Sequence, residues 1–270
     1  MLGGSITSLN ACQAELERQV AGNAALASQF SAGLGSLLLA LDGSPALVRA
    51  LANPNRDVAS RKRLVQGAMA GLSAKVVDLS TFVVAQRWSQ DSDLGDAVEH
   101  LALDAALAEA ECLGLLEELE AELFELDIAL VSHRDLRTAL GDTVATAAAR
   151  GKLLDQVFAQ SLLPQTSQLV KRMVMHPRGR GIRYSLKFLG DLVAARRKRL
   201  VAVVQTARPL SKTQIDQLGA VLSKQYGQPI QLNVAVDPQT VGGLRIRVGH
   251  EVVDGTVVAR LKDLKRAIAA

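Results

Sequence analysis

Residues that could carry out chemistry are few in this 270-residue chain, and they are scattered. The two cysteines, Cys12 and Cys112, are too few for a disulfide scaffold or a cysteine-based zinc site. The histidines stand alone, and none belongs to an H-E-x-x-H pattern; they are His100, His133, His176 and His250. Because a metal site needs several converging ligands, each histidine is interpreted as a surface or capping residue. We therefore expect no metal site.

Glycine-rich phosphate loops are also incomplete. Gly151-Lys152 has Thr146 at the position where a G-x-x-x-x-G-K-[ST] loop needs its first glycine. Neither G-x-G pair has the third glycine of a dinucleotide fingerprint, and no serine stands in a nucleophile elbow. No lysine or helix start follows Gly242-Gly243, so this pair predicts a structural turn. These patterns predict a non-catalytic protein without a cofactor.

Two basic stretches raise the possibility of nucleic-acid binding. They are Arg196-Arg197-Lys198-Arg199 and the upstream segment 175–180, MHPRGR. Such binding would need stacking aromatic residues, but Tyr184 and Phe188 fall at helical spacing with Leu192, which is typical of core positions. The simpler interpretation of the first stretch is a basic helix end, where the helix dipole favours cations.

Composition indicates what kind of structure must hold these residues. The chain is 49% hydrophobic but only 3% aromatic, and this bias favours close-packed helices over a β-sandwich. The longest nearly uncharged apolar stretch, Phe30 to Leu41, is shorter than the roughly 20 residues of a membrane-spanning helix. A signal peptide has Lys or Arg before its apolar stretch, but residues 1–10 contain neither. We expect a cytoplasmic chain that does not cross the membrane.

Charge is divided unequally along the chain. The formal net charge is +4, but residues 1–147 carry −10 and residues 148–270 carry +14. Opposed charges at the two ends favour a molecule with a different partner at each end. The alternative is that both charged surfaces are simply solvated.

An internal repeat organises the first 200 residues. A shift of 89 residues aligns 26–69 with 115–158 and gives 12 identities, among them Leu34 with Leu123 and Arg61 with Arg150. Composition alone would give roughly three or four identities. Leu79 and Leu101 continue the match to Leu169 and Leu189 after small gaps. The repeat predicts two tandem helical bundles.

Each copy has the pattern of five or six short helices. In the second copy, the leucines between Leu115 and Leu130 form one apolar stripe, and glutamates occupy the opposite face. In the first copy, Ser44-Pro45 predicts a helix start and residues 53–55, NPN, predict its end. Short bundles of this kind are compact.

After residue 199 the periodicity changes. Leu200 to Ala207 predicts a strand, and Ser211 with Gln214 predicts a capping box that begins a helix. Two alternating segments, 230–236 and 244–248, predict half-buried strands. A last helix is expected from about Thr256, with an apolar stripe at Val257, Leu261, Leu264 and Ile268. The tail is therefore a small β-α-β-β-α unit.

The fold class is mainly α. We expect three domains: an additional helical bundle over residues 1–105, a second bundle over 106–199, and a small α/β domain over 200–270.

The tail resembles a known family. The resemblance lies in residues 200–204, LVAVV, then Tyr226-Gly227, and above all the ordered run 242–256, GGLRIRVGHEVVDGT. This run is similar to the δ subunit of bacterial F-type ATP synthases, whose mitochondrial counterpart is the oligomycin-sensitivity-conferring protein. The ordinary family member resembles residues 106–270, and the extra bundle resembles the longer δ subunits of actinobacteria.

The resemblance implies a non-catalytic stator subunit of a proton-translocating enzyme. Its partners would be the α subunits of the catalytic head, bound by the helical part, and the b subunits of the peripheral stalk, bound by the tail. It would lie peripherally on the cytoplasmic side of the cell membrane, without nucleic acid. The stripe on the last helix would bind the stalk or complete the tail's core. A helical adaptor outside bioenergetics and a nucleic-acid-binding protein remain the alternatives.

Overall fold

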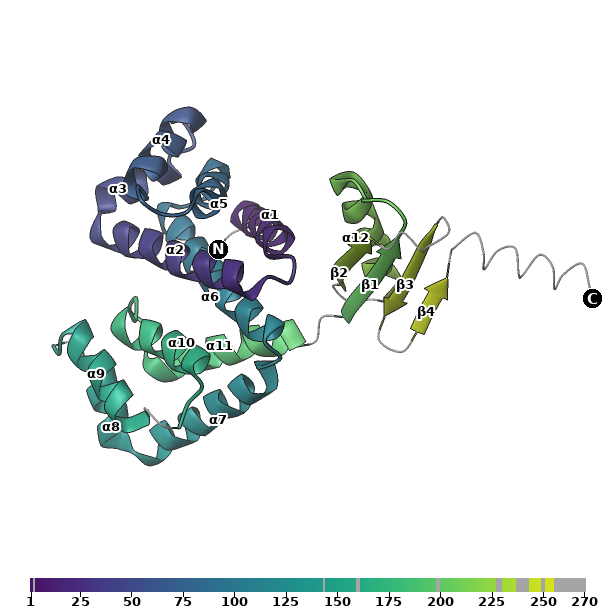
Figure 1. Ribbon diagram of the computed structural model, residues 1–270. Coiled ribbons are helices and arrows are strands. Elements are labelled where there is room, and N and C mark those ends of the chain that lie inside the picture. Colours follow the sequence, from purple (N-terminus) through teal and green to yellow (C-terminus); the bar gives the residue numbers. More distant parts are fainter. Residues whose placement is uncertain are drawn as a thin grey trace, which may run out of the picture. The chain divides into compact units, whose positions relative to one another are not determined.

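The structure is a computed structural model, and it describes residues 1, 3–142, 144–158, 161–197, 200–226, 230–236, 243–248 and 251–254. The described chain is mainly helical and has one small sheet. It divides into two compact units, Met1–Ala194 and Ala195–Ala270. The described residues of the first unit form helices, and the sheet belongs to the second unit (Figure 1).

Short polar side chains and a proline begin several helices of the first half of the helical unit. The Ser44 hydroxyl accepts a hydrogen bond from the Leu47 N–H at 3.2 Å, and Pro45 occupies the first turn, where its missing N–H costs nothing. The predicted helix start at this position is confirmed. Six helices make up this half: α1 (Gly3–Val20), α2 (Ala24–Gly43), α3 (Pro45–Ala52), α4 (Val58–Ala68), α5 (Ala74–Ala85) and α6 (Asp91–Cys112).

The second half of the helical unit follows the same order. Its helices are α7 (Leu116–Ser132), α8 (Arg134–Gly141), α9 (Ala147–Phe158), α10 (Pro164–Met175) and α11 (Ile182–Arg197). Helix α8 begins 89 residues after α3, and α9 begins 89 residues after α4. The helix starts thus keep the offset of the sequence repeat.

Helix α6 contributes to two clusters of buried apolar side chains. Leu94 and Leu101 belong to the cluster formed with α1 to α5, whereas Leu103 and Leu107 belong to the cluster formed with α7 to α11. One continuous helix therefore joins the two clusters (Figure 1). The expected boundary between residues 105 and 106 lies inside this helix, and the three-domain organisation stays a prediction.

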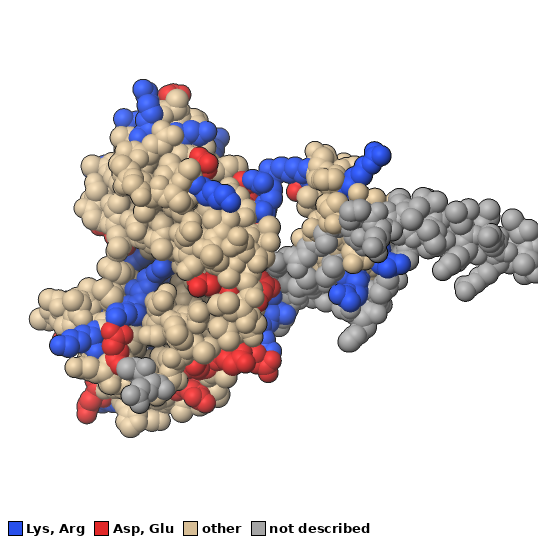
Figure 2. Space-filling model, in the orientation of Figure 1, with Lys and Arg blue, Asp and Glu red and all other residues tan. Residues whose placement is uncertain are grey.

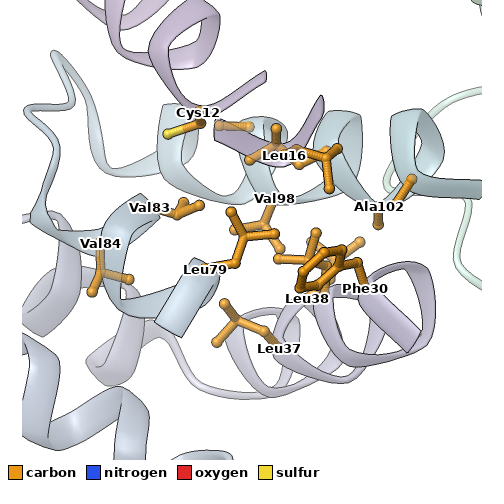
Figure 3. Close-up of a cluster of buried hydrophobic side chains, with 14 of the residues drawn as sticks. Cys12, Leu16, Phe30, Leu37, Leu38, Leu79, Val83, Val84, Val98 and Ala102 are labelled. Atoms are coloured by element: carbon orange, nitrogen blue, oxygen red, sulfur yellow. The ribbon is translucent and has the colours of Figure 1, made fainter. Parts of the chain in front are cut away.

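Helices α2 and α6 pack closely against each other, and small residues permit this. Ala27 of α2 and Ala102 of α6 are both completely buried. A Cβ atom added to Gly33 of α2 would lie 2.2 Å from Cγ1 of Val76, so α5 also approaches α2 as closely as the backbone allows. Figure 3 shows Phe30 of α2 in the cluster shared with α5. The first half is thus a closed, tightly packed bundle.

A buried arginine occupies the same repeat position in each half. Arg61 of α4 donates hydrogen bonds to the Val84 and Gln86 carbonyl oxygens, at 2.7 and 3.2 Å, at the end of α5. Arg150 of α9 donates to the Val174 and Met175 carbonyl oxygens, at 2.9 and 3.1 Å, at the end of α10. Each guanidinium satisfies carbonyl groups that a helix end leaves without an intrahelical partner. The sequence identity of Arg61 and Arg150 thus corresponds to the same contact with a helix end in both halves.

The second unit contains a four-stranded sheet covered by one helix. Its elements are β1 (Leu200–Thr206), α12 (Lys212–Tyr226), β2 (Ile230–Val236), β3 (Leu244–Val248) and β4 (Glu251–Asp254), and the strand order is β2-β1-β3-β4. Strand β1 pairs parallel with β2 and antiparallel with β3, and β3 pairs antiparallel with β4. Strand β4 was not expected from the sequence.

Local signals in this unit act as expected. The Ser211 N–H donates to Oε1 of Gln214 at 2.9 Å, and the Gln214 N–H donates to the Ser211 hydroxyl at 3.3 Å, which completes the predicted capping box before α12. On β3, Ile246 and Val248 are buried and Arg247 is exposed, as the alternation predicts. The buried side chains pack with Leu222 of α12. The final helix expected from about residue 256 lies outside the described residues.

Among the described residues, one helix is long and apolar enough to span a membrane. It is α2, and half of its most apolar window is buried inside the protein. Its buried side chains, such as Phe30, Leu34 and Leu37, form the centre of the first apolar cluster. These contacts identify α2 as a core helix.

Candidate helix-binding groove

A groove of about 580 Å³ runs between α7 and α11. Leu123 and Leu186 form an apolar floor, and both are almost completely buried. Phe124 and Tyr184 flank this floor, with exposed fractions of 67% and 62%. Exposure of two large aromatic rings beside an apolar floor is typical of a surface that another protein covers.

An exposed apolar stripe on α7 continues this surface. Phe124, Ile128 and Val131 follow one another at steps of four and three, so they lie on one side of the helix. Ile128 and Val131 have exposed fractions of 49% and 52%. Helical periodicity predicts the buried leucine stripe of α7. It also predicts that the opposite face of this helix is solvated, and the exposed apolar stripe is therefore not expected from it. The second apolar spacing within the glutamate-rich segment was the signal that could have revealed this exposed stripe.

Tyr184 is not a core residue, and that expectation was wrong. The core stripe of α11 is Ile182, Leu186, Leu189 and Val193, at steps of four, three and four. Tyr184 falls off this stripe, so it faces away from the core. Phe188 and Leu192 are partly buried and pack against the core, as expected.

Ion pairs border the groove on both helices. Arg183 donates two hydrogen bonds to the Asp127 carboxylate, at 2.7 and 2.9 Å, and this pairing lowers the pKa of Asp127. Lys187 and Asp191 pair at 2.9 Å one turn apart on α11. The first pair connects α7 to α11 beside the groove.

The side chains of the upstream basic stretch bind within the helical unit. Arg178 donates a hydrogen bond to the Gly95 carbonyl oxygen at 2.9 Å and lies 3.3 Å from the Asp96 carboxylate and 3.7 Å from Asp42. Arg180 pairs with Glu99 of α6. The loop after α10 is thereby fixed to α6, and these two arginines have an internal role instead of forming a nucleic-acid surface.

Much of the site expected on the tail lies outside the described residues. This holds for Val257, Leu261, Leu264, Ile268 and Gly242. Gly243 has a φ angle of +79°, in the left-handed region that glycine enters at no steric cost.

The histidines of the described chain take structural positions. His100 hydrogen-bonds Asp104 at 3.2 Å and meets the ring of Phe188 edge-on, with ring centroids 5.7 Å apart. His133 is exposed where α8 begins, and His176 follows the last residue of α10. Across the residues that the structure describes, no group of three or more His, Cys, Asp and Glu side chains could hold a metal ion.

Comparison with known proteins identifies the family. The family model for the ATP synthase delta (OSCP) subunit matches residues 103–268, so the match begins within α6. A chain of the Toxoplasma gondii mitochondrial ATP synthase hexamer gives a TM-score of 0.29 at 20% identity, covering 62% of this chain and 95% of that one. A score that low does not establish a common arrangement.

Relatives match the chain along its length. A protein of Beutenbergia cavernae named ATP synthase subunit delta is 38% identical over 270 residues, which is all of both chains. Its counterpart in Streptomyces avermitilis is 41% identical over 244 residues, 90% of this chain and 89% of that one. The Streptomyces lividans protein of the same name is 38% identical over 270 residues, covering 100% and 99%. The predicted resemblance to the long δ subunits of actinobacteria is confirmed, and the relatives match the additional N-terminal helices as well.

Proposed function

The chain belongs to the ATP synthase delta (OSCP) subunit family, and from this membership we propose that it is a stator subunit of the peripheral stalk of an F-type ATP synthase. In this role it links the catalytic head to the stalk so that the head cannot turn with the rotor. It is itself non-catalytic and acts by binding.

The helical unit binds the N-terminal segments of the α subunits in the head. The observation that carries this assignment is the groove between α7 and α11, where an apolar floor lies beside exposed aromatic rings. A groove between two helices accepts the apolar face of a third helix. The helical unit comprises two tandem bundles that share α6, and the second bundle presents the groove.

The second unit binds the b subunits. Its sheet has one face covered by α12, and the apolar stripe expected at Val257, Leu261, Leu264 and Ile268 offers a further surface for a stalk helix. The complex places the chain peripherally at the cell membrane, on the cytoplasmic side. Two binding units in one chain raise the effective concentration of the second contact once the first has formed.

Deletion of residues 200–270 tests the link. Membrane vesicles that carry the shortened chain should hydrolyse ATP without building a proton gradient, because the head is no longer held to the stalk. Quenching of a pH-sensitive dye, measured beside phosphate release, separates the two activities. Normal proton pumping by such vesicles would refute the stator function.

A milder variant tests the tail stripe alone. Replacing Leu261 and Leu264 with Asp should weaken coupling in the same assay, because charged groups are costly to bury at an apolar contact. Circular dichroism of the purified variant serves as the control for folding. Wild-type coupling in a folded double variant would exclude the stripe from the stalk contact.

A further inference from the structure

Exposed basic side chains gather at one end of the first half of the helical unit. Residues 44–77 contain six Lys or Arg and one acidic residue, a net charge of +5. Five of the six cations are exposed, and together we call them the basic surface: Arg49 of α3, Arg56 of the following loop, Lys62 and Arg63 of α4, and Lys75 of α5. Figure 2 shows Lys and Arg side chains over the end of the helical unit where α4 lies. The sixth cation, Arg61, is buried and bonds the end of α5.

The charges of the basic surface are not neutralised within the described chain. None of its five cations forms an ion pair with another residue that the structure describes. The one acidic residue of the segment, Asp57, accepts a hydrogen bond from the Ser60 N–H at 3.1 Å and thereby caps α4. In the second half, by contrast, Arg178 and Arg180 pair with carboxylates of α2 and α6. The positive field of the basic surface is therefore available to an anionic partner.

The repeat shows that the fold does not require these cations. Three of them have uncharged counterparts 89 residues further on: Arg49 with Thr138, Arg56 with Ala145 and Lys62 with Gly151. The whole counterpart segment, residues 133–166, has a net charge of only +1. The buried Arg61, however, is repeated as Arg150, because both arginines bond a helix end. The exposed cations are thus specific to the first half and are not explained by folding.

The surrounding side chains indicate that the anionic partner is a protein. Residues 44–77 include no Phe, Tyr or Trp, whereas single-stranded nucleic acids are bound largely by stacking on aromatic rings. A helix that lies on a membrane buries a continuous apolar face, but the large apolar side chains exposed in this segment are Val58 and Leu72, 14 positions apart. Scattered apolar contacts among cations suit an acidic polypeptide.

We propose that the basic surface binds an acidic segment of another ATP synthase subunit, whose Asp or Glu side chains lie against Arg56, Lys62 and Arg63. The inference rests on the proposed function for the identity of the complex, and it adds a contact made by the first half of the helical unit. This contact is electrostatic and lies on α3 to α5, so it is separate from the groove between α7 and α11. It gives the duplicated half a binding role of its own.

A carbodiimide tests the proposal in the assembled complex. This reagent joins a lysine amine directly to a carboxylate in ion-pair contact and leaves no spacer between them. The complex that contains the full chain is solubilised and treated, and mass spectrometry then locates the new amide bonds. We expect Lys62 or Lys75 to be joined to an Asp or Glu of another subunit. Lys152 is the matched control, because it is an exposed lysine on α9 of the second half, and it should give no such adduct.

Charge reversal gives a quantitative test. Arg56→Glu combined with Arg63→Glu should lower the yield of the Lys62 adduct about tenfold, because like charges would then face each other. The same charge change in the second half, Arg134→Glu combined with Lys152→Glu, should leave that yield unchanged. All four positions are exposed, so both variants should fold, and circular dichroism checks this. An unchanged yield in a folded Arg56→Glu, Arg63→Glu chain would overturn the proposal.

Salt provides a further check on the wild-type chain. Raising the salt concentration from about 0.05 M to about 0.5 M before the reagent is added should lower the adduct yield, because attraction between exposed charges is screened. A yield that does not change with salt would contradict an electrostatic contact.

The possible outcomes separate the two levels of inference. If the chain purifies with ATP synthase subunits but Lys62 and Lys75 form adducts only within this chain, with a second copy of it or with nothing, the surface proposal is wrong and the stator function stands. Cosedimentation with vesicles of phosphatidylglycerol and phosphatidylcholine, without an adduct to another subunit, would assign the surface to anionic lipid and also overturn the proposal. If the chain purifies with no ATP synthase subunit, the proposed function fails, and the partner proposed for this surface fails with it.

Discussion

The helix pairs α2–α6 and α7–α11 occupy corresponding places in the repeat and differ in what they do with their facing surfaces. Between α2 and α6, small side chains such as Ala27 and Ala102 allow the backbones to come close, and Phe30 and Leu37 fill the core beside them. Between α7 and α11, larger side chains and a bridging ion pair border an open groove. The position on α2 that corresponds to Phe124 is Gly35, and Arg172 of α10 lies beside it, while Arg178 donates a hydrogen bond to the Gly95 carbonyl oxygen of α6. The second half of the unit thus contacts this surface of the first half, whereas the corresponding surface of the second half is an open groove.

The largest expected effect on stability concerns helix α6, which contributes buried side chains to both halves of the repeat. We expect a fragment of residues 106–199 to be mostly helical but about 4 kcal/mol less stable than a fragment of residues 91–199. The shorter fragment lacks buried Leu103 and Glu99, the partner of Arg180, and loss of a buried leucine alone accounts for about 2–5 kcal/mol.

Circular dichroism during urea unfolding measures both fragments, and a fragment of residues 1–112 serves as the control for the first cluster. Equal unfolding midpoints for the fragments 106–199 and 91–199 would mean that the second cluster does not depend on residues 91–105 of α6.

Removal of the repeated arginines should have the next largest effect. Arg150→Met should lower the free energy of unfolding by about 3 kcal/mol, because buried carbonyl oxygens lose a charged donor. Arg61→Met should cost about half as much, since Arg150 also bonds the Asp142 carbonyl at 2.8 Å and contacts four carbonyl groups where Arg61 contacts two. Urea denaturation of the full chain provides the comparison. A larger loss of unfolding free energy for Arg61→Met than for Arg150→Met would show that the number of carbonyl contacts does not set the contribution of these arginines.

Two glycine substitutions compare the packing around α2 in the first half of the repeat with the packing around α11 in the second half. Gly33→Ala should destabilise the chain by about 1–3 kcal/mol, because the added methyl group would overlap the stiff side chain of Val76. Gly190→Ala should stabilise it by about 0.5–1 kcal/mol, because nothing lies within 4 Å of the added atom and alanine favours the helix. Thermal unfolding can detect both changes. The same sign for both variants would argue against different packing of the two halves.

The smallest expected effect concerns His100, which lies between the two halves of the repeat. Burial favours its neutral ring, but the hydrogen bond and charge attraction to Asp104, with Glu99 nearby, outweigh burial and raise its pKa. A raised pKa means that its stabilising contribution is fully present below about pH 6.5 and is lost as the pH rises through the higher folded pKa. Urea unfolding from pH 5.5 to 8.5 should show this decline in the wild type and not in His100→Gln. An unchanged profile in the variant would assign the decline to another group.

Local signals in the sequence predicted several elements correctly. Ser44-Pro45 begins α3, and the Ser211–Gln214 capping box precedes α12, because each device involves residues within one helical turn. The alternation on β3 also predicted which of its side chains are buried. These features depend on neighbours in the chain, so the residue types suffice.

The groove could not be predicted in the same way. Helical spacing shows that Tyr184 and Phe188 could share a face, but which face is buried depends on the neighbours that α11 meets. The sequence likewise gives no indication that Arg178 reaches the Gly95 carbonyl, 83 residues away. The family resemblance came from the run 242–256, which points to the tail and says nothing about a groove in the helical unit.

Chemical labelling of the buried Cys12 thiol can report how often the first half of the repeat opens. Its side chain is inaccessible in the cluster around α1, and burial, with a contribution from the charge of Glu15, raises its pKa to about 12. A thiol that is both covered and protonated resists alkylation until the helices around it separate. In a Cys112→Ser chain, the rate of iodoacetamide labelling would therefore record transient opening of this one cluster. Comparing that rate with and without the assembled complex would reveal whether a partner on the second half slows fluctuations in the first.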